Sequence, residues 1–273
     1  AIKKGSKLSI SNDKLKTHFQ KHFSARNIPI PPEIEKPEEF PQLNDEKITI
    51  NEGIPTENEV EEVLKTFKNG KSGGTDKLKT EGLKYNNSVH LVKSILILMT
   101  LIWTLVKVPT IWLHATITCL FKKGKMSEAQ NYRGLSIGAN MSRIIAKLLM
   151  IRLKEAYEKQ LGKEQFGFRQ NRSTSDGIFI IRNVIEKYGK TIVAVYIDLT
   201  AAYDHVPRDF LFKVLVIRTG AKHLIAILKK MYEATTASIC GMKAKFDVLI
   251  GCRQGGQESP CLFNYYFDYV LKI

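Results

Sequence analysis

The sequence predicts an α+β fold, with mixed helices around a small antiparallel sheet. Two observations support this class. The chain has 273 residues, 44% of them hydrophobic, which is enough for a sizeable core in one large domain or two modest ones. Apolar residues recur at helical spacing in several segments, and short β-branched or apolar runs typical of strands lie among them. No internal repeat or low-complexity tract is present.

Residues 1–55 are predicted to form a basic N-terminal tail followed by a Pro/Glu-rich linker. Residues 1–27 hold seven Lys or Arg against one Asp. Six of the nine prolines and most of the acid excess follow between Asn27 and Pro55, and this composition resists regular structure. The first residue is not Met and no secretory signal is present, so we expect a fragment.

Two helices are expected next. Thr56 and Glu59 form a capping box ahead of an apolar stripe from Val60 to Phe67, and Gly70 is placed to end that helix. The apolar run 95–106 is about 12 residues, short of the roughly 18 to 20 that span a membrane. We expect it to be a core helix, with no membrane partner.

The rest of the chain alternates between helical and strand patterns. Thr191–Ile197 is apolar and β-branched almost throughout, which predicts a central strand buried on both faces with Asp198 at its end. After the Gly-rich loop 251–257, Ser259 can cap a helix with Pro260 in its first turn. Further helices are predicted over 141–157, 175–188, 207–217 and 221–234, a strand over 110–121, and a hairpin of 236–240 and 245–250 through Gly241.

The charge balance favours a polyanionic partner. The net charge is +15, and residues 64–273 hold 33 Lys or Arg against 15 Asp or Glu, a net +18. Nucleic acid is the first candidate partner and an anionic membrane the second. The four cysteines are too far apart for a CxxC zinc pair and too few for a disulfide scaffold, so we expect reduced thiols.

Asp198 and Asp204 are the candidate acidic site. Taken alone, their spacing more often indicates an Asp that begins a turn or caps a helix. In a strongly basic chain, however, an acidic cluster at the end of a buried strand suits a magnesium-dependent enzyme that acts on phosphates.

Several motifs in order resemble the reverse transcriptase domain of non-long-terminal-repeat retrotransposons (long interspersed elements), over roughly residues 57–273. The motifs are LFKKG (120–124), NYRGLS (131–136), QFGFR (165–169), RSTSD (172–176), IDLTAAYD (197–204), GCRQG (251–255) and SPCLFN (259–264). No single motif is diagnostic, but the ordered set is highly specific.

The resemblance implies a right-hand polymerase, with a fingers-like region over 56–190 and a partial palm over 191–273. It implies a fragment of an RNA-directed DNA polymerase that adds deoxynucleotides to a DNA primer on an RNA template by two-metal phosphoryl transfer with Mg²⁺. It also implies an intracellular location, in the nucleus or cytoplasm, as a retrotransposon ribonucleoprotein.

The resemblance assigns roles residue by residue. Asp198 matches the palm aspartate that binds both magnesium ions, and Tyr203 the aromatic beneath the incoming sugar that excludes a ribose 2′-hydroxyl. A buried core aromatic is a compatible interpretation of Tyr203, whereas Asp204 is expected in a turn or salt bridge. The sequence also contains His205, which we expect at the surface or behind the site.

Nucleotide and template contacts are implied for other residues. Arg133 with Lys122 or Lys123 matches the cations that grip the triphosphate; for either lysine a solvated basic face is an equal alternative. Gln254 and Gly255 match the loop that lies against the incoming nucleotide and the template. Phe168 and Arg169 match a segment near the template, with core packing of the phenylalanine as the equal alternative.

The family continues into an aromatic-Ala-Asp-Asp hairpin that carries a second metal ligand, whereas the sequence stops at Ile273. Asp268 falls within the preceding predicted helix and cannot replace that ligand. We therefore expect this chain to be inactive by itself. The alternative is a degenerate copy that acts only as a basic nucleic-acid-binding module, and a group II intron maturase type is a minor third option.

Overall fold

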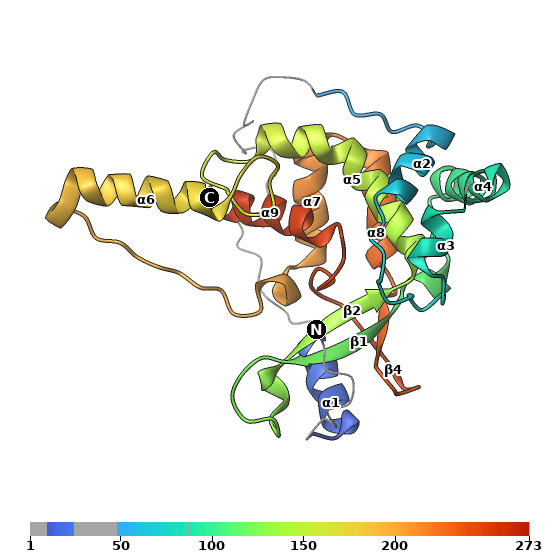
Figure 1. Cartoon of the computed structure of the whole chain (residues 1–273), viewed down its shortest axis with the longest axis horizontal. Helices are drawn as coiled ribbons and strands as arrows, with labels where there is room; N and C mark the ends of the chain where they lie inside the picture. The colour runs from blue at the N-terminus through green and yellow to red at the C-terminus, as the bar shows by residue number, and fades with distance from the viewer. Residues whose placement is uncertain (1–9, 25–47, 87, 273) are drawn as a thin grey trace.

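A computed structural model of the chain describes residues 10–24, 48–86 and 88–272. The predicted α+β class is confirmed, because helices pack around one four-stranded sheet with strand order β2-β1-β3-β4 (Figure 1). Most of the predicted Pro/Glu-rich linker lies outside the described residues. None of the described helices is long and apolar enough to cross a membrane.

The sheet joins two hairpins that are distant in sequence. β1 (His114–Phe121) and β2 (Tyr132–Gly138) pair antiparallel, as do β3 (Thr236–Ile239) and β4 (Lys245–Asp247). The turn at Gly241, with φ at +86°, confirms the second predicted hairpin. β1 and β3 run parallel, so the sheet is mixed and the expected all-antiparallel sheet is wrong. The two hairpins meet through their first strands, and β2 was not predicted.

Helices α2, α4, α5, α7, α8 and α9 share the larger core. The capping box is present, since the Glu59 amide donates to Thr56 Oγ1 and the Thr56 amide to Glu59 Oε2, although α2 ends at Lys65, before Gly70. Trp103 and Met99 of α4 are buried in this core. The bounds are α2 (Glu57–Lys65), α3 (Thr80–Lys84), α4 (Val89–Leu105), α5 (Asn140–Gln160), α7 (Arg208–Thr219), α8 (Lys222–Tyr232) and α9 (Ser259–Val270).

Short 3₁₀ turns and caps refine the predicted bounds. The first residues of the strand expected over 110–121 form η3 (Thr110–Trp112). Ser259 does not cap α9 but is its first residue, and its hydroxyl donates to the carbonyl of Arg253 at 2.7 Å. Pro260 lies in the first turn of α9 as predicted. The other 3₁₀ turns are η4 (Ala129–Asn131), η5 (Gly189–Thr191) and η6 (Ala202–His205).

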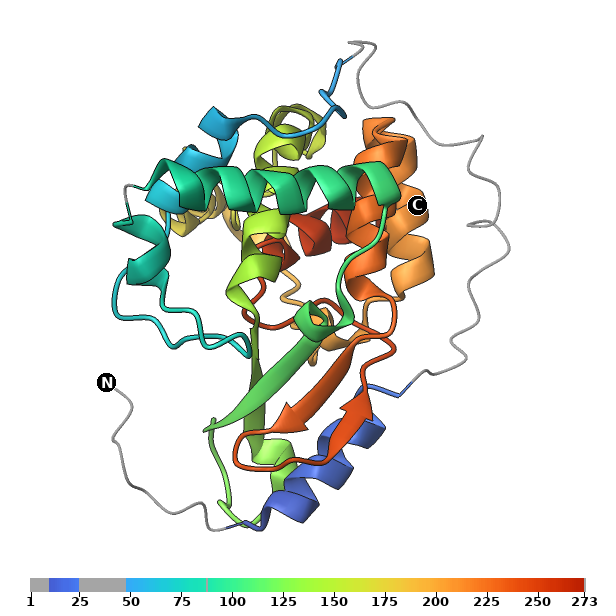
Figure 2. The ribbon, with the colours of Figure 1, turned by 90° about the vertical axis from the view of Figure 1, so that its right-hand side faces the viewer.

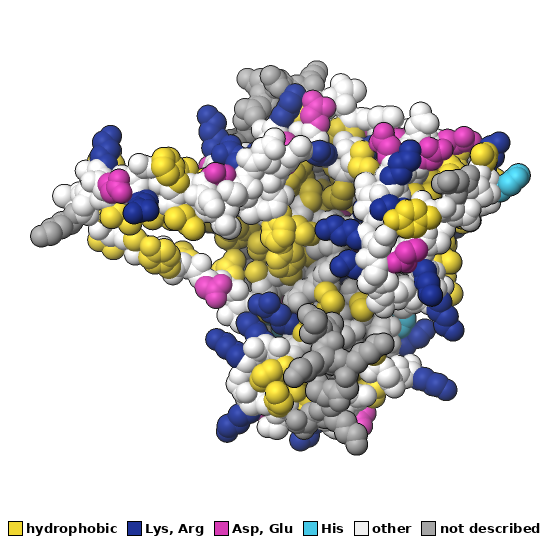
Figure 3. Space-filling model, viewed as in Figure 1, with side chains coloured by type: hydrophobic (Ala, Val, Ile, Leu, Met, Phe, Trp, Pro, Cys, Tyr) yellow, Lys and Arg dark blue, Asp and Glu magenta, His cyan; other side chains and the backbone are white. Residues whose placement is uncertain are grey.

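The prediction of a buried strand over 191–197 is wrong. α6 (Thr174–Tyr188) ends at Gly189 as predicted, but the helix projects from the body and the chain returns beneath it as extended backbone (Figure 1). Val193 is 91% exposed and Ile197 81%. No other described segment pairs with this run, and a strand needs a neighbour to satisfy its amide and carbonyl groups. The space-filling view shows hydrophobic side chains along this projection (Figure 3).

Part of the predicted N-terminal tail is a helix. α1 (Asn12–His22) is capped at its N-terminus by Ser11, whose hydroxyl accepts a hydrogen bond from the amide of Lys14. Figure 2 shows it packed against the sheet, on the side away from the larger helical core. Its buried residues Leu15 and Phe19 form a second core with side chains of the sheet. Residues 10–24 therefore contribute to the fold.

Candidate nucleotide-binding site

The turn around η6 and the Gly-rich loop 251–257 are built as one unit. The amide of Cys252 donates to the carbonyl of Tyr203 at 2.7 Å, and the amide of Gly251 to that of Val206 at 2.9 Å. Gly251 has φ at +83°, and a Cβ there would lie 2.6 Å from the carbonyl oxygen of Asp204. Only glycine fits such a conformation at so close an approach. The matched motifs at 197–204 and 251–255 therefore meet in space.

Tyr203 lies partly buried on this unit. Its ring stacks on Phe263 of α9, with centroids 4.6 Å apart and an angle of 19° between the planes. Its hydroxyl is buried without a hydrogen-bond partner among the described residues. Burial, followed by the nearby Cys252, raises the pKa of Tyr203. The phenol is therefore neutral at physiological pH, and its hydroxyl can still donate and accept a hydrogen bond.

Gln254 is held from two sides. Its side-chain amide nitrogen donates to both oxygens of Asp204 at 2.7 Å, and its backbone carbonyl accepts from the amide of Ser136 on β2 at 2.8 Å. Gly255 has φ at +98°, and a Cβ there would come within 2.8 Å of Leu135. The loop thus lies directly on β2.

Strand β2 also carries the predicted triphosphate-binding cation. Arg133 is exposed. It lies three residues before Ser136 on the same strand, which is roughly 10 Å at the usual rise per residue. Lys122 and Lys123 are exposed where the β1–β2 hairpin turns, and the Lys122 amide donates to the carbonyl of Asn131. In the described ranges, none of these three cations forms an ion pair. The structure therefore places Tyr203, Gln254, Gly255 and the Arg133 strand together, with both lysines at one end of the same hairpin.

Asp198 is not part of this assembly. It is exposed on the extended run that follows α6, six residues before Asp204. The Asp204 carboxylate accepts hydrogen bonds from Gln254 and from His22, whose Nε2 lies 3.1 Å from it. Across the described part of the chain, no three His, Cys, Asp or Glu side chains gather in a way that could hold a metal ion. The described residues do not by themselves form a magnesium site.

The predicted template residues have separate environments. Phe168 is 68% exposed at a left-handed backbone position (φ +57°), whose carbonyl accepts from the Tyr157 hydroxyl at 3.1 Å. It lines a cleft of about 440 Å³ together with Lys147, Lys154 and other residues. The buried-core alternative for Phe168 is not what the structure shows.

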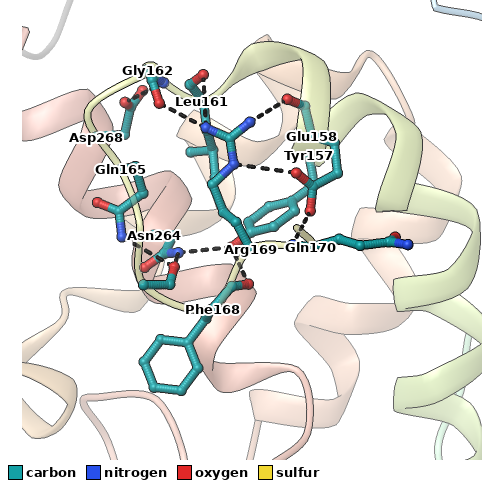
Figure 4. A network of polar contacts seen from close by, with 11 residues as sticks. Tyr157, Glu158, Leu161, Gly162, Gln165, Phe168, Arg169, Gln170, Asn264 and Asp268 are labelled. Atoms are coloured by element: carbon teal, nitrogen blue, oxygen red, sulfur yellow. Dashed lines mark hydrogen bonds and ion pairs between the residues drawn. The ribbon is translucent and has the colours of Figure 1, made fainter. Parts of the chain in front are cut away.

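Arg169 has no free guanidinium nitrogen. Figure 4 shows it bonded to the Glu158 carboxylate at 3.2 Å and to the carbonyls of Glu158, Leu161 and Gly162. The same network includes Asp268 of α9, which accepts from the Gly162 amide at 3.0 Å. Arg169 therefore fixes the loop that displays Phe168, and a phosphate would have to displace these partners.

Asp268 has a structural role. Burial alone would raise its pKa, but hydrogen bonds from Lys272, the Gly162 amide and Arg218 outweigh burial and lower the pKa below its ordinary value. Its carboxylate lies 2.6 Å from Arg218 and 2.9 Å from Lys272. The expectation that Asp268 cannot serve as the second metal ligand agrees with this full set of partners.

Sequence reasoning missed two residues of the site region. His22 reaches Asp204 from α1, 182 residues away, and no local pattern reports such a contact. Arg208 donates to the carbonyl of Gly251 at 3.0 Å and to the Val248 carbonyl at 2.7 Å, so it supports the start of the loop. The sequence places Arg208 four residues after Asp204, and this closeness to the motif was the signal for Arg208.

The comparisons with known proteins agree with the motifs. The family described as reverse transcriptase (RNA-dependent DNA polymerase) matches residues 121–273, more than half of the chain. The chain belongs to this family.

The similar proteins include products of transposable elements and of an intron. The transposon TX1 uncharacterized 149 kDa protein of Xenopus laevis is 24% identical over 59% of the chain and 13% of that protein. The Pol polyprotein from the type-1 retrotransposable element R2 of Popillia japonica is 27% identical over 60% and 24%. An uncharacterized 91 kDa protein in the cob intron of Schizosaccharomyces pombe is 26% identical over 50% and 16%. The chain thus spans less than a quarter of these relatives' lengths.

Proposed function

We propose that this chain is the nucleotide-binding and template-binding part of an RNA-directed DNA polymerase that extends a DNA primer with deoxynucleoside triphosphates. The observation that carries the proposal is the joining of the Tyr203 turn and the Gln254 loop on the strand of Arg133. An aromatic ring, an amide and an arginine on adjoining segments suit a sugar, a base and a phosphate group.

In this proposal the chain's own residues bind and orient the substrate. Arg133 binds triphosphate oxygens with its planar fork, and Lys122 or Lys123 adds a point charge. Tyr203 lies beneath the sugar, and its ring is held in place by stacking on Phe263. Phe168 offers a stacking face at the cleft lined by Lys147 and Lys154, where a template strand would lie.

Asp198 is proposed as a carboxylate that binds a divalent cation. Such ions prefer oxygen ligands, and the side chain is exposed. Further carboxylates would have to join it, since the described residues do not supply a complete set.

Primer extension tests this function. In a longer protein in which the family's aromatic-Ala-Asp-Asp hairpin follows this chain, we expect extension on an RNA template with magnesium. Asp198→Asn should abolish extension and leave template binding nearly intact, because the residue is exposed and its side chain forms no hydrogen bond or ion pair with the described residues. Retained extension would contradict the proposed role of Asp198. Tyr203→Ala should admit ribonucleotides, and unchanged sugar discrimination would count against its role.

The second candidate is a nucleic-acid-binding module without polymerase activity. It is favoured by the net +18 of residues 64–273 together with the lack of an assembled metal site among the described side chains. Binding of an RNA–DNA duplex to the 273-residue chain, followed by fluorescence anisotropy, should weaken steeply with salt as counterions are released. Strong salt dependence without extension by the longer protein would select this candidate, and salt-independent affinity would argue against it.

A further inference from the structure

Helix α1 is anchored on the strand that carries Arg133. Phe19 is 3% exposed, and its ring lies against Gly134 of β2. A Cβ at Gly134 would meet Phe19 at 2.8 Å and Ile117 at 3.0 Å, so the strand is shaped to receive the ring. Leu15 of α1, fully buried, belongs to the same apolar cluster. The helix is therefore held in a fixed place on the sheet.

The C-terminal end of α1 reaches the Gln254 loop. The amide of Leu249, five residues before Gln254, donates to the carbonyl of Phe23 at 3.0 Å. The His22 ring lies 5.0 Å from the ring of His205, and its Nε2 lies 3.1 Å from Asp204. One helix thus contacts the Arg133 strand, the turn of Tyr203 and the start of the loop.

The hydrogen bonds at Asp204 fix their donors' orientation. An ionised carboxylate only accepts, so His22 must present a proton on Nε2, and Gln254 must turn its nitrogen toward Asp204. The oxygen of the Gln254 amide then faces away from Asp204. Asp204 is 5% exposed, and a carboxylate so deeply buried is costly without donors. Loss of His22 would leave the Gln254 side chain as the only side-chain donor that the described residues offer it.

We propose that His22 and Asp204 are positioning residues that hold the Gln254 amide in one orientation for the incoming nucleotide. This rests on the proposed polymerase function and deepens it. Helix α1 becomes part of the polymerase site, although it lies far outside residues 121–273, which the family matches. His22 acts through Asp204, and Asp204 acts through Gln254.

Single-nucleotide incorporation by the longer protein is the first test. His22→Ala should raise KM for the deoxynucleotide by about tenfold, the effect of losing one hydrogen bond to a charged group, with kcat within about twofold. His22→Gln should restore KM, because its side-chain amide can donate to Asp204. Asp204→Asn should raise KM further, since its amide accepts Gln254 in either orientation. Gln20→Ala is the control, an exposed residue on the same helix whose side chain forms no hydrogen bond with the described residues.

Hydrogen exchange of the 273-residue chain is the second test and needs no activity. Peptides covering 249–257 should exchange faster in His22→Ala and Asp204→Asn than in wild type or Gln20→Ala. Unchanged exchange and unchanged KM in His22→Ala would overturn the proposal, as would a raised KM that His22→Gln does not reverse. If the wild-type protein extends no primer, the proposed function fails. Exchange then decides whether α1 holds the loop.

Discussion

Arg208 connects α7 to the backbone that leads into the Gln254 loop, and replacing it tests how that loop is held. Burial lowers the pKa of Arg208 to about 10, which leaves it charged at neutral pH. Its guanidinium forms five hydrogen bonds, to the backbone oxygens of Gly251 (3.0 Å), Tyr232 (2.8 Å), Val248 (2.7 Å) and Ile250 (3.3 Å) and to Thr235 Oγ1 (2.9 Å). No carboxylate of the described chain pairs with it, so its charge is met by carbonyl dipoles.

Arg208→Met keeps an apolar stem and removes the donors. The Thr235 hydroxyl has one proton, which it can donate to the Val248 carbonyl (2.7 Å) or to the Tyr232 carbonyl (3.4 Å) but not to both, and the carbonyls of Gly251 and Ile250 lose the donor that Arg208 supplies. A buried acceptor without a partner costs about 1–3 kcal/mol, and removal of a buried charge returns part of that. We expect the free energy of unfolding to fall by about 3 kcal/mol.

Urea unfolding followed by far-UV circular dichroism measures this change. Arg182→Met is the matched control, because the Arg182 side chain is 79% exposed on α6 and, among the described residues, pairs only with Glu186 one turn away. The control should change stability by less than about 0.5 kcal/mol. A loss at Arg208 no larger than that of the control would refute the reasoning that these bonds hold the loop.

Three further outcomes can be measured on the same chain. Gly251→Ala should lower the free energy of unfolding by about 2 kcal/mol or more, because its φ is +83° and a Cβ would touch backbone of η6; an unchanged urea midpoint would contradict this. At pH 8, iodoacetamide should modify the exposed Cys240 first and Cys119 slowly, since burial raises the pKa of Cys119 to about 11; equal rates by mass spectrometry would count against that burial. The lowered pKa of Asp268 means that its ion pairs stabilise the fold fully above its ordinary pKa of 3.8 and lose this effect as pH falls through the lower folded value. Asp268→Asn should therefore destabilise the chain at pH 7 and flatten the acid branch of its stability profile, and parallel profiles would argue against the pairing.

Sequence patterns predicted correctly the elements whose stabilising contacts join residues close together in the chain. The capping box at Thr56 and the hairpin through Gly241 each depend on residues within a few positions, and both are confirmed. Helices α5, α7 and α8 follow from apolar spacing, within a few residues of their predicted ends. The family motifs also placed Tyr203 and Gln254 in segments that the structure brings together.

The differences between the predictions and the structure concern partners that sequence alone does not display. The run 191–197 has the composition of a buried strand, but composition does not supply a neighbouring strand. Arg169 is of a type that binds phosphate, yet the same fork suits the carbonyls and carboxylate that surround it. α1 was assigned to a tail because its partners, Gly134 and Asp204, lie more than a hundred residues away.

The position of β1 in the sheet bears on how fragments of such chains are chosen for expression. The family match begins at Phe121, the last residue of β1. β1 is the strand that joins the β2 side of the sheet to the β3 side. A fragment cut at the matched range would lose this strand together with α1, and its two remaining sheet pieces would have no backbone bonds to each other. For this fold, a boundary drawn from sequence similarity would divide the sheet on which the Gln254 loop rests.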